Sequence, residues 1–200
     1  MWVVKLGGSL AYSEDLQGWL RVLASDSSLV IVPGGGPFAD QVRHAYNQWE
    51  FDESTAHRMA LLAMEQFGTM LCALQPGLTA AASVEEIDDV QQRGETPVWM
   101  PSLMVMAEPD IAHSWEVTSD SLSAWLSGRV GADTLLLVKS IPLTGISQDV
   151  DKLAEGGVID SEFSRYFQSN AIPAWLMSAS DHAHFGAVRN GEMDRASMIT

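Results

Sequence analysis

Two glycine turns, each following a short apolar run, decide the fold of this chain: Trp2-Val3-Val4-Lys5-Leu6-Gly7-Gly8-Ser9 and Leu29-Val30-Ile31-Val32-Pro33-Gly34-Gly35-Gly36. Both apolar runs are short and rich in aliphatic, often β-branched residues, which is typical of buried strands. Pro37 follows the second turn. Proline suits the first turn of a helix, because its φ is already helical and an N–H there would be unpaired. We therefore expect a strand, a glycine turn and a helix at each place, the second helix running to about Gln48.

The same alternation of apolar runs and amphipathic segments continues along the chain. Apolar runs predict further strands over residues 78–82, 96–100, 134–138, 174–177 and 197–199. Apolar residues at helical spacing predict helices over 13–24, 55–74 and 181–189. Two further helices are expected from their starts: one begins at a capping box formed by Ser83 and Glu86, and the other begins at Thr118 or Ser119. Strands separated by helices in this way are typical of βαβ units. We expect an α/β fold of three layers, with a mostly parallel sheet between two helical layers, in a single domain over residues 1–200.

The charge balance excludes whole classes of partner. The 200 residues include 26 Asp and Glu against 11 Lys and Arg, which gives a formal net charge of −15. Duplex DNA and anionic membranes both require a basic surface, so neither is an expected partner. No apolar run approaches the ~20 residues that span a bilayer. The single cysteine, Cys72, cannot form an internal disulfide, which suits a reducing compartment, and we expect a cytoplasmic protein.

The glycine turns are the first candidates for a binding site. In an open parallel sheet, ligands bind at the carboxyl ends of the strands, where both turns lie. Glycine lets an anion approach bare amides, and the N-terminus of a following helix adds a partial positive charge. Each turn therefore predicts a cradle for a phosphate or carboxylate, with Lys5 supplying a cation at the first. The alternative is a pair of tight strand-to-helix turns that bind nothing.

Two familiar glycine-rich nucleotide motifs fit these turns poorly. A Walker A loop places its lysine after the glycines, whereas Lys5 precedes them. The second turn matches a dinucleotide fingerprint as Gly34-x-Gly36-x-x-Ala39, with Asp52 and Glu53 at the distance expected for a ribose contact. An NAD-dependent oxidoreductase is therefore one alternative function, although it leaves the first turn unexplained.

A third polar segment comes just before a predicted helix, at Ala112-His113-Ser114-Trp115-Glu116-Val117-Thr118-Ser119-Asp120. Asp120 falls in the first turn of that helix, where the helix dipole favours a carboxylate. Asp120 either only satisfies the dipole or also orients a nearby lysine. His57, His113 and Trp115 are candidates to line a pocket, with ordinary packing as the alternative for each.

Together these segments resemble the amino acid kinase superfamily. The matching pieces, in the family's order, are Lys5-Leu6-Gly7-Gly8-Ser9-Leu10, Val32-Pro33-Gly34-Gly35-Gly36, Thr118-Ser119-Asp120-Ser121-Leu122-Ser123 and the strand 135–138 leading to Gly145. Within the superfamily the chain is most similar to the compact kinases of methanofuran biosynthesis, through His57 and Ala112-His113-Ser114-Trp115. The resemblance implies an ATP- and Mg²⁺-dependent phosphotransferase that converts [5-(aminomethyl)furan-3-yl]methyl phosphate to its diphosphate. It also favours a homodimer or larger homo-oligomer, as does the apolar helix expected over 55–74.

The resemblance also assigns roles to individual residues. Lys5 would hold the transferring phosphoryl group, and Asp120 would accept hydrogen bonds from this lysine and from the glycine amides. The implied phosphate- and ATP-binding residues are Gly7, Gly8, Ser9, Lys139, Ser140 and Gly145. The implied acceptor-binding residues are Gly34, Gly35, Gly36, His57, Trp115, Thr118 and Ser119. No side chain is assigned as a metal ligand, because Mg²⁺ would bridge the β- and γ-phosphates through phosphate oxygens and water.

The end of the nucleotide strand departs from the family pattern. Many relatives have Thr-Asp there, whereas this chain has Lys139 and Ser140, and Lys152 is its only lysine further on. Either Lys139 supplies the second phosphate-binding cation, or the site is weaker than in the relatives. The second possibility would make the chain a nucleotide-binding or regulatory protein without turnover. A phosphate acceptor is already ionised, so a kinase of this kind needs positioning and charge stabilisation but no general base.

Overall fold

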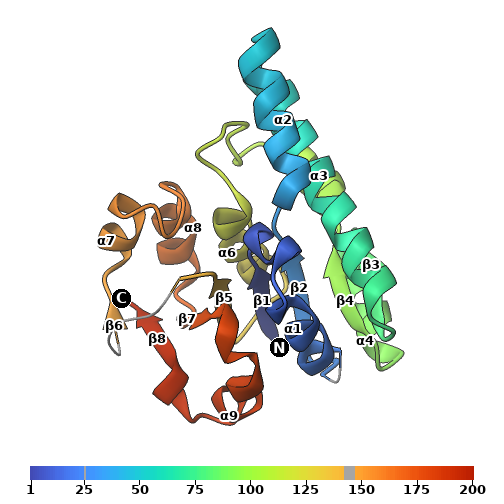
Figure 1. The fold of residues 1–200 in the computed structure, drawn as a ribbon, viewed down its shortest axis with the longest axis vertical. Coiled ribbons are helices and arrows are strands. Elements are labelled where there is room, and N and C mark those ends of the chain that lie inside the picture. The colour runs from blue at the N-terminus through green and yellow to red at the C-terminus, as the bar shows by residue number, and fades with distance from the viewer. Residues whose placement is uncertain (25, 142–146) are drawn as a thin grey trace.

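The sheet confirms the predicted α/β architecture (Figure 1). The computed structural model describes residues 1–24, 26–141 and 147–200. The strands are β1 (Trp2–Leu6), β2 (Leu29–Pro33), β3 (Leu78–Ala81), β4 (Thr96–Trp99), β5 (Thr134–Lys139), β6 (Ser147–Gln148), β7 (Ala174–Ser178) and β8 (Ala196–Ile199). They form a sheet in the order β3-β4-β2-β1-β5-β7-β8-β6. Among the described strands, the β7–β8 pair is antiparallel and the other pairs are parallel.

Helices lie on both sides of this sheet (Figure 1). The α-helices are α1 (Asp15–Leu23), α2 (Gly36–Trp49), α3 (Glu53–Leu74), α4 (Val84–Gln92), α5 (Ser102–Ala107), α6 (Ser119–Arg129), α7 (Val150–Glu155), α8 (Phe163–Asn170) and α9 (Phe185–Arg189). Short 3-10 helices are η1 (Gly8–Tyr12), η2 (Ala179–His184) and η3 (Met193–Arg195). The helix predicted over 181–189 is present, but its first half belongs to the 3-10 helix η2 and α9 begins only at Phe185. None of the helices in the described part of the chain is long and apolar enough to cross a membrane.

Strand residues alternate between two apolar layers, one on each face of the sheet. On β1, Val3 belongs to the layer that contains Leu122 of α6 and Phe163 of α8. Val4, the next residue, belongs to the layer that contains Trp19 of α1. Every residue of β1 is buried. Burial on both faces explains why these strands are continuously apolar, and it gives the three layers that the sequence predicts.

The two longest helices, α2 and α3, lie side by side and project past the carboxyl edge of the sheet (Figure 1). Asp52 caps α3 by accepting a hydrogen bond from the N–H of Thr55 at 2.8 Å. The predicted helix is thus present, but it is not buried on every face. Leu62 and Leu74 are 41% and 48% exposed.

Side-chain caps fix the starts of two further helices. Ser83 accepts a hydrogen bond from the N–H of Glu86 at 3.2 Å, as expected. The Glu86 carboxylate instead bonds to the N–H of Ala82 at 2.7 Å, one residue before the partner that a capping box requires. Thr118, one of the two candidates, caps α6. Asp120 therefore lies in the first turn of α6, as predicted.

The two glycine turns lie against each other at the carboxyl edge, because β1 and β2 are neighbouring parallel strands. The N–H of Gly34 donates to the carbonyl of Leu6 at 2.8 Å. A Cβ atom on Gly8 would lie 2.3 Å from the backbone nitrogen of Gly36, and one on Gly34 would lie 2.4 Å from that of Gly8. Gly36 also has a φ of 54°, which glycine adopts without strain. Close backbone contact thus requires glycine in both turns.

The replacement Gly34→Ala should lower the thermal unfolding midpoint, because the new methyl group would collide with the backbone of Gly8. Overpacking costs about 1–3 kcal/mol. Each kcal/mol lowers the Tm of a chain of this size by roughly 2–4 °C. The matched control is Gly186→Ala in α9, where nothing lies within 4 Å of the new Cβ. Alanine there should leave Tm unchanged or raise it. Calorimetry measures both variants, and equal Tm values would contradict this account.

Candidate functional site

The candidate site lies where the connections leave the sheet in opposite directions. β1 continues to its neighbour β2 on one side, whereas β5, its other neighbour, continues to β7 on the opposite side. The strand order thus reverses between β1 and β5, and in sheets of this kind ligands bind outside the carboxyl ends of the strands at such a point. Lys5 and Lys139 lie near these ends, with Lys5 level with Leu137.

A buried carboxylate joins the two lysines. Lys5 Nζ lies 2.8 Å from Asp120 Oδ1, and Lys139 Nζ lies 2.6 Å from Asp120 Oδ2. Lys5 and Asp120 are each only 5% exposed. The structure thus brings three predicted residues together from β1, α6 and β5. We call Lys5, Asp120 and Lys139 the charge cluster.

Burial and these contacts set the protonation states of the charge cluster. Burial raises the pKa of Asp120, but the charges and hydrogen bonds of Lys5 and Lys139 outweigh it and hold the pKa below its ordinary value. Burial and the charge of Lys5 lower the pKa of Lys139 from 10.5 to about 8, against the attraction of Asp120 and Asp160. Lys139 can therefore lose its charge at mildly alkaline pH.

One expected set of contacts is wrong. The resemblance implies hydrogen bonds from the glycine amides to Asp120, but within the described residues its carboxylate contacts the two lysines instead. The physical reason is that an ammonium group lies against each carboxylate oxygen, Lys5 at Oδ1 and Lys139 at Oδ2. The departure from the family pattern after β5 therefore places a second cation on this carboxylate.

Asp160, which the sequence analysis does not single out, anchors the helix that carries Asp120. It accepts hydrogen bonds from the N–H and the hydroxyl of Thr118 at 3.0 and 2.7 Å. It also accepts from the N–H of Ser121 at 3.0 Å and from the Ser121 hydroxyl. A carboxylate at a helix N-terminus satisfies free N–H groups and the helix dipole. Asp160 follows these partners by 42 and 39 residues, so no local spacing reveals the contact.

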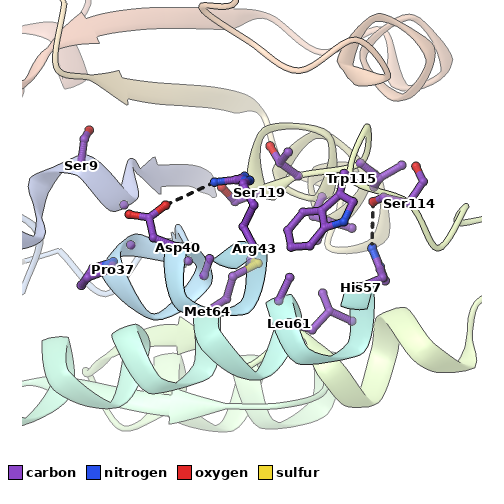
Figure 2. A pocket seen from close by; sticks show the side chains of 18 of the residues that line it. Ser9, Pro37, Asp40, Arg43, His57, Leu61, Met64, Ser114, Trp115 and Ser119 are labelled. Atoms are coloured by element: carbon purple, nitrogen blue, oxygen red, sulfur yellow. Dashed lines mark hydrogen bonds and ion pairs between the residues drawn. The ribbon is translucent and has the colours of Figure 1, made fainter. Parts of the chain in front are cut away.

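One pocket, of about 400 Å³, opens beside the glycine turns and extends from Ser9 to His57 (Figure 2). The predicted residues that line it are Gly8, Ser9, Gly35, Gly36, His57, Trp115, Thr118 and Ser119. Its apolar walls are Leu61, Met64, Val117 and Leu122. Gly34 does not line it, because Gly34 lies against Gly8. This first pocket therefore combines a glycine-rich end with an apolar middle.

A second pocket, of about 490 Å³, lies at the carboxyl ends of β5 and β7. Its lining residues are Ser13, Asp15, Ser140, Ile141, Ser178, Ala179, Ser180, Asp181 and Arg195. The hydroxyl oxygens of Ser9 and Ser140 are 2.8 Å apart, so a hydrogen bond links the two pockets. Gly145 lies outside the described residues. The site therefore consists of two adjoining pockets, with the charge cluster on the strands and helix that frame them.

Arg43, for which the sequence alone indicates no functional role, is a cation at the first pocket. Arg43 pairs with Asp40 at 3.2 Å, and its guanidinium carbon lies 5.1 Å from the ring centre of Trp115. The only signal in the sequence is that both charged residues belong to the helix after the second glycine turn. Two adjoining pockets with three cations around them suit the transfer of a charged group between two anionic ligands.

A curated relative shares much of this sequence. [5-(Aminomethyl)furan-3-yl]methyl phosphate kinase from Methanocaldococcus jannaschii is 29% identical to this chain over 144 residues. The match covers 70% of this chain and 66% of the relative, just under two thirds of the relative's length.

Solved structures share the fold over the whole chain. Uridylate kinase from Archaeoglobus fulgidus superposes with a TM-score of 0.74 at 15% identity, covering 100% of this chain and 99% of that one. UMP kinase from Bacillus anthracis superposes with a TM-score of 0.74 at 13% identity, covering 100% of this chain and 95% of that one. UMP kinase from Ureaplasma parvum superposes with a TM-score of 0.73 at 12% identity, covering 100% of this chain and 97% of that one. Identities this low show the fold alone.

The sequence model of the amino acid kinase family matches residues 1–152, which include both glycine turns and the whole charge cluster. The match extends over most of the chain, and the elements that carry the motifs lie as that family's fold requires. The chain therefore belongs to the amino acid kinase family.

Proposed function

We propose that this protein is an ATP-dependent kinase that transfers the γ-phosphoryl group of ATP to a phosphate monoester in the cytoplasm. The observation that carries the proposal is the charge cluster on the strands and helix that frame the two adjoining pockets. The proposed acceptor is [5-(aminomethyl)furan-3-yl]methyl phosphate, the compound named for the relative from Methanocaldococcus jannaschii. The product would be the corresponding diphosphate and ADP.

The shapes of the pockets support one arrangement of the two ligands. The acceptor would occupy the first pocket, with its phosphate at the Gly8 and Ser9 end and its ring between the apolar walls. A volume of about 400 Å³ suits a small molecule of this size. The nucleotide would occupy the second pocket, with its phosphates directed toward Ser140 and Lys139. The two reacting phosphates would then meet beside the Ser9–Ser140 contact.

Transfer at this junction needs charge stabilisation rather than proton removal. An oxygen of the acceptor phosphate forms a bond to the γ-phosphorus while the bond to the β–γ bridging oxygen breaks. ADP leaves with that electron pair, and no proton is removed because the attacking phosphate is already ionised. Lys5 and Lys139 would stabilise the charge on the transferring group, and Asp120 would hold both ammonium groups in position.

Mg²⁺ would enter with the nucleotide as part of the substrate, where it neutralises charge on the β- and γ-phosphates. The second pocket contains two carboxylates, Asp15 and Asp181. Oxygen ligands of this kind fit a hydrated magnesium ion, which keeps several of its waters in proteins. Asp15 and Asp181 would hold a hydrated ion of this kind beside the nucleotide.

The two other functions that the sequence leaves open receive less support. The Lys139-Ser140 departure motivates a nucleotide-binding protein without turnover, yet both side chains make contacts at the junction. A dinucleotide site at the second glycine turn lacks space, because the backbone of Gly8 fills the position above Gly34. Asp52, which that site would direct to a ribose, caps α3 instead.

The replacement Lys5→Ala should abolish measurable transfer, because it removes a cation from the developing charge. Loss of one such group lowers kcat by about 10²–10³-fold or more. Asp120 keeps its ion pair with Lys139, so we expect the variant to fold. ADP release with the furan phosphate measures transfer, and circular dichroism checks the fold.

The control for this experiment is Lys152→Ala on the exposed face of α7, which should keep the wild-type rate. Wild-type turnover in Lys5→Ala would exclude the proposed role of Lys5. A wild-type protein that ATP protects against heat, but that releases no ADP with any phosphate acceptor, would favour the alternative without turnover.

The pH dependence should report the charge on Lys139. Its pKa is lowered to about 8, so its positive charge and kcat/KM for the acceptor should both fall as the pH rises through about 8. Bound phosphates favour the charged lysine and raise its pKa, so kcat should persist to higher pH. In Lys139→Arg the fall near pH 8 should disappear, since arginine stays charged. The control Lys152→Arg should retain it, and a fall that survives in Lys139→Arg would assign the titration to another group.

The replacement Asp160→Asn should lower kcat about tenfold or more while changing KM little, because the N-terminus of α6 and with it Asp120 would lose their anchor. Loss of a helix cap also costs about 0.5–2 kcal/mol of stability. Asp149→Asn is the matched control, since Asp149 caps α7 through the N–H of Lys152 at 3.0 Å. We expect Tm to fall in both variants, and further in Asp160→Asn because Asp160 accepts more hydrogen bonds, but we expect kcat to fall only in Asp160→Asn. Equal kcat values in Asp160→Asn and Asp149→Asn would show that Asp160 acts only as a structural helix cap.

A further inference from the structure

His57 is buried, yet one of its ring nitrogens has no partner. It lies on α3 with 3% of its surface exposed, and it lines the first pocket. Within the described residues, Nε2 is buried and makes no hydrogen bond. Buried polar atoms without a partner are rare, because each costs free energy. Because His57 lines the first pocket, a ligand bound there is the candidate partner for this nitrogen.

The other ring nitrogen decides what Nε2 offers to a ligand. Nδ1 lies 3.2 Å from the carbonyl oxygen of Ser114, and a carbonyl only accepts, so Nδ1 carries a hydrogen. Burial lowers the pKa of His57, the Ser114 contact opposes this, and neighbouring His113 lowers it further. The ring is therefore neutral near pH 7, and Nε2 presents a lone pair. His113 stacks on the ring at 5.2 Å and helps to fix its orientation.

A second unpaired polar atom belongs to the same part of the pocket. The indole N–H of Trp115 is buried and makes no hydrogen bond within the described residues. Figure 2 shows Trp115 and His57 near each other, away from the Ser9 end. Arg43 over the indole face and Tyr46 against it, at 5.8 Å between ring centres, hold the indole in place. This end of the pocket therefore offers one acceptor, His57 Nε2, and one donor, Trp115 Nε1.

We propose that His57 selects the phosphoryl acceptor by accepting a hydrogen bond from a donor group at the end of the molecule opposite its phosphate. This inference rests on the proposed kinase function and names the residue that recognises the acceptor. The donor is an ammonium or a hydroxyl on a short arm, and the aminomethyl group of the furan phosphate is of the first kind. Arg43 does not prevent an ammonium from binding, because its charge is paired with Asp40. The indole N–H of Trp115 suits an acceptor atom in the middle of the ligand, such as a ring oxygen.

The test compares three acceptors that differ only in the group opposite the phosphate: the aminomethyl furan phosphate and its hydroxymethyl and methyl analogues. For the wild-type protein, we expect kcat/KM to be about 10- to 100-fold higher for a donor-bearing acceptor than for the methyl analogue. A higher kcat/KM for the aminomethyl compound identifies an ammonium as the natural donor. A higher kcat/KM for the hydroxymethyl analogue identifies an alcohol. Equal values for all three acceptors would overturn the inference.

Two replacements of His57 separate recognition from folding. Asparagine can still donate to the Ser114 carbonyl but has no atom at the position of Nε2, so His57→Asn should lose the preference, with kcat/KM for the donor-bearing acceptor falling to the value for the methyl analogue. Glutamine can place an amide oxygen near Nε2, so His57→Gln should recover part of the preference. The matched control is His44→Asn on the exposed surface of α2, which should behave as wild type. A full preference retained in His57→Asn would overturn the inference.

The design distinguishes failure of this inference from failure of the proposed function. A protein that phosphorylates all three acceptors equally is a kinase in which His57 does not recognise a donor. A protein that releases no ADP with any of them is not a kinase for these acceptors. In that case, calorimetric dissociation constants for the same three compounds still test recognition by His57, since the same ratios are expected for binding.

Discussion

The pairing of two lysines with one buried carboxylate is the interaction on which the rest of the site depends. Moving charged groups out of water is costly, and only close, well-oriented opposite charges offset the cost. Asp120 supplies that charge for Lys5 and Lys139 at 2.8 and 2.6 Å. The arrangement needs β1 and β5 to be neighbours and needs α6 to begin at one particular place. Asp160 meets the second requirement by bonding to the first turn of α6.

The same cluster explains how a very acidic chain can handle anionic ligands. The net charge is −15, but two of its three lysines lie in the cluster. Local potential in a cleft depends on the nearest charges and amides more than on the distant surface. Bare amides at the glycine turns add to the positive end of the site. The acidic surface therefore affects how fast a nucleotide arrives at low salt more than whether it binds.

Much of the fold follows from local sequence. The apolar runs at 2–6 and 29–33 could be predicted because burial on both faces leaves few polar residues in such strands. The turn glycines and Asp120 could be predicted as site residues because each carries a local signal in a turn or at a helix start. Asp160 and the contact of Arg43 with Trp115 could not, because the partners come from other elements and no spacing encodes the contact. The state of His57 was equally hidden, since it depends on the carbonyl of Ser114, 57 residues away.

The contact between the two glycine turns has a consequence for any attempt to change the acceptor. Each turn occupies the space that a side chain on the other would need, so neither can be varied by itself. Gly8 and Gly34 therefore cannot be replaced one at a time to change the ligand. The surfaces that remain adjustable come from α3 and from the segment before α6, where side chains rather than backbone form the wall. Divergence of acceptor choice on this scaffold would be concentrated there, while the phosphate end stays constant.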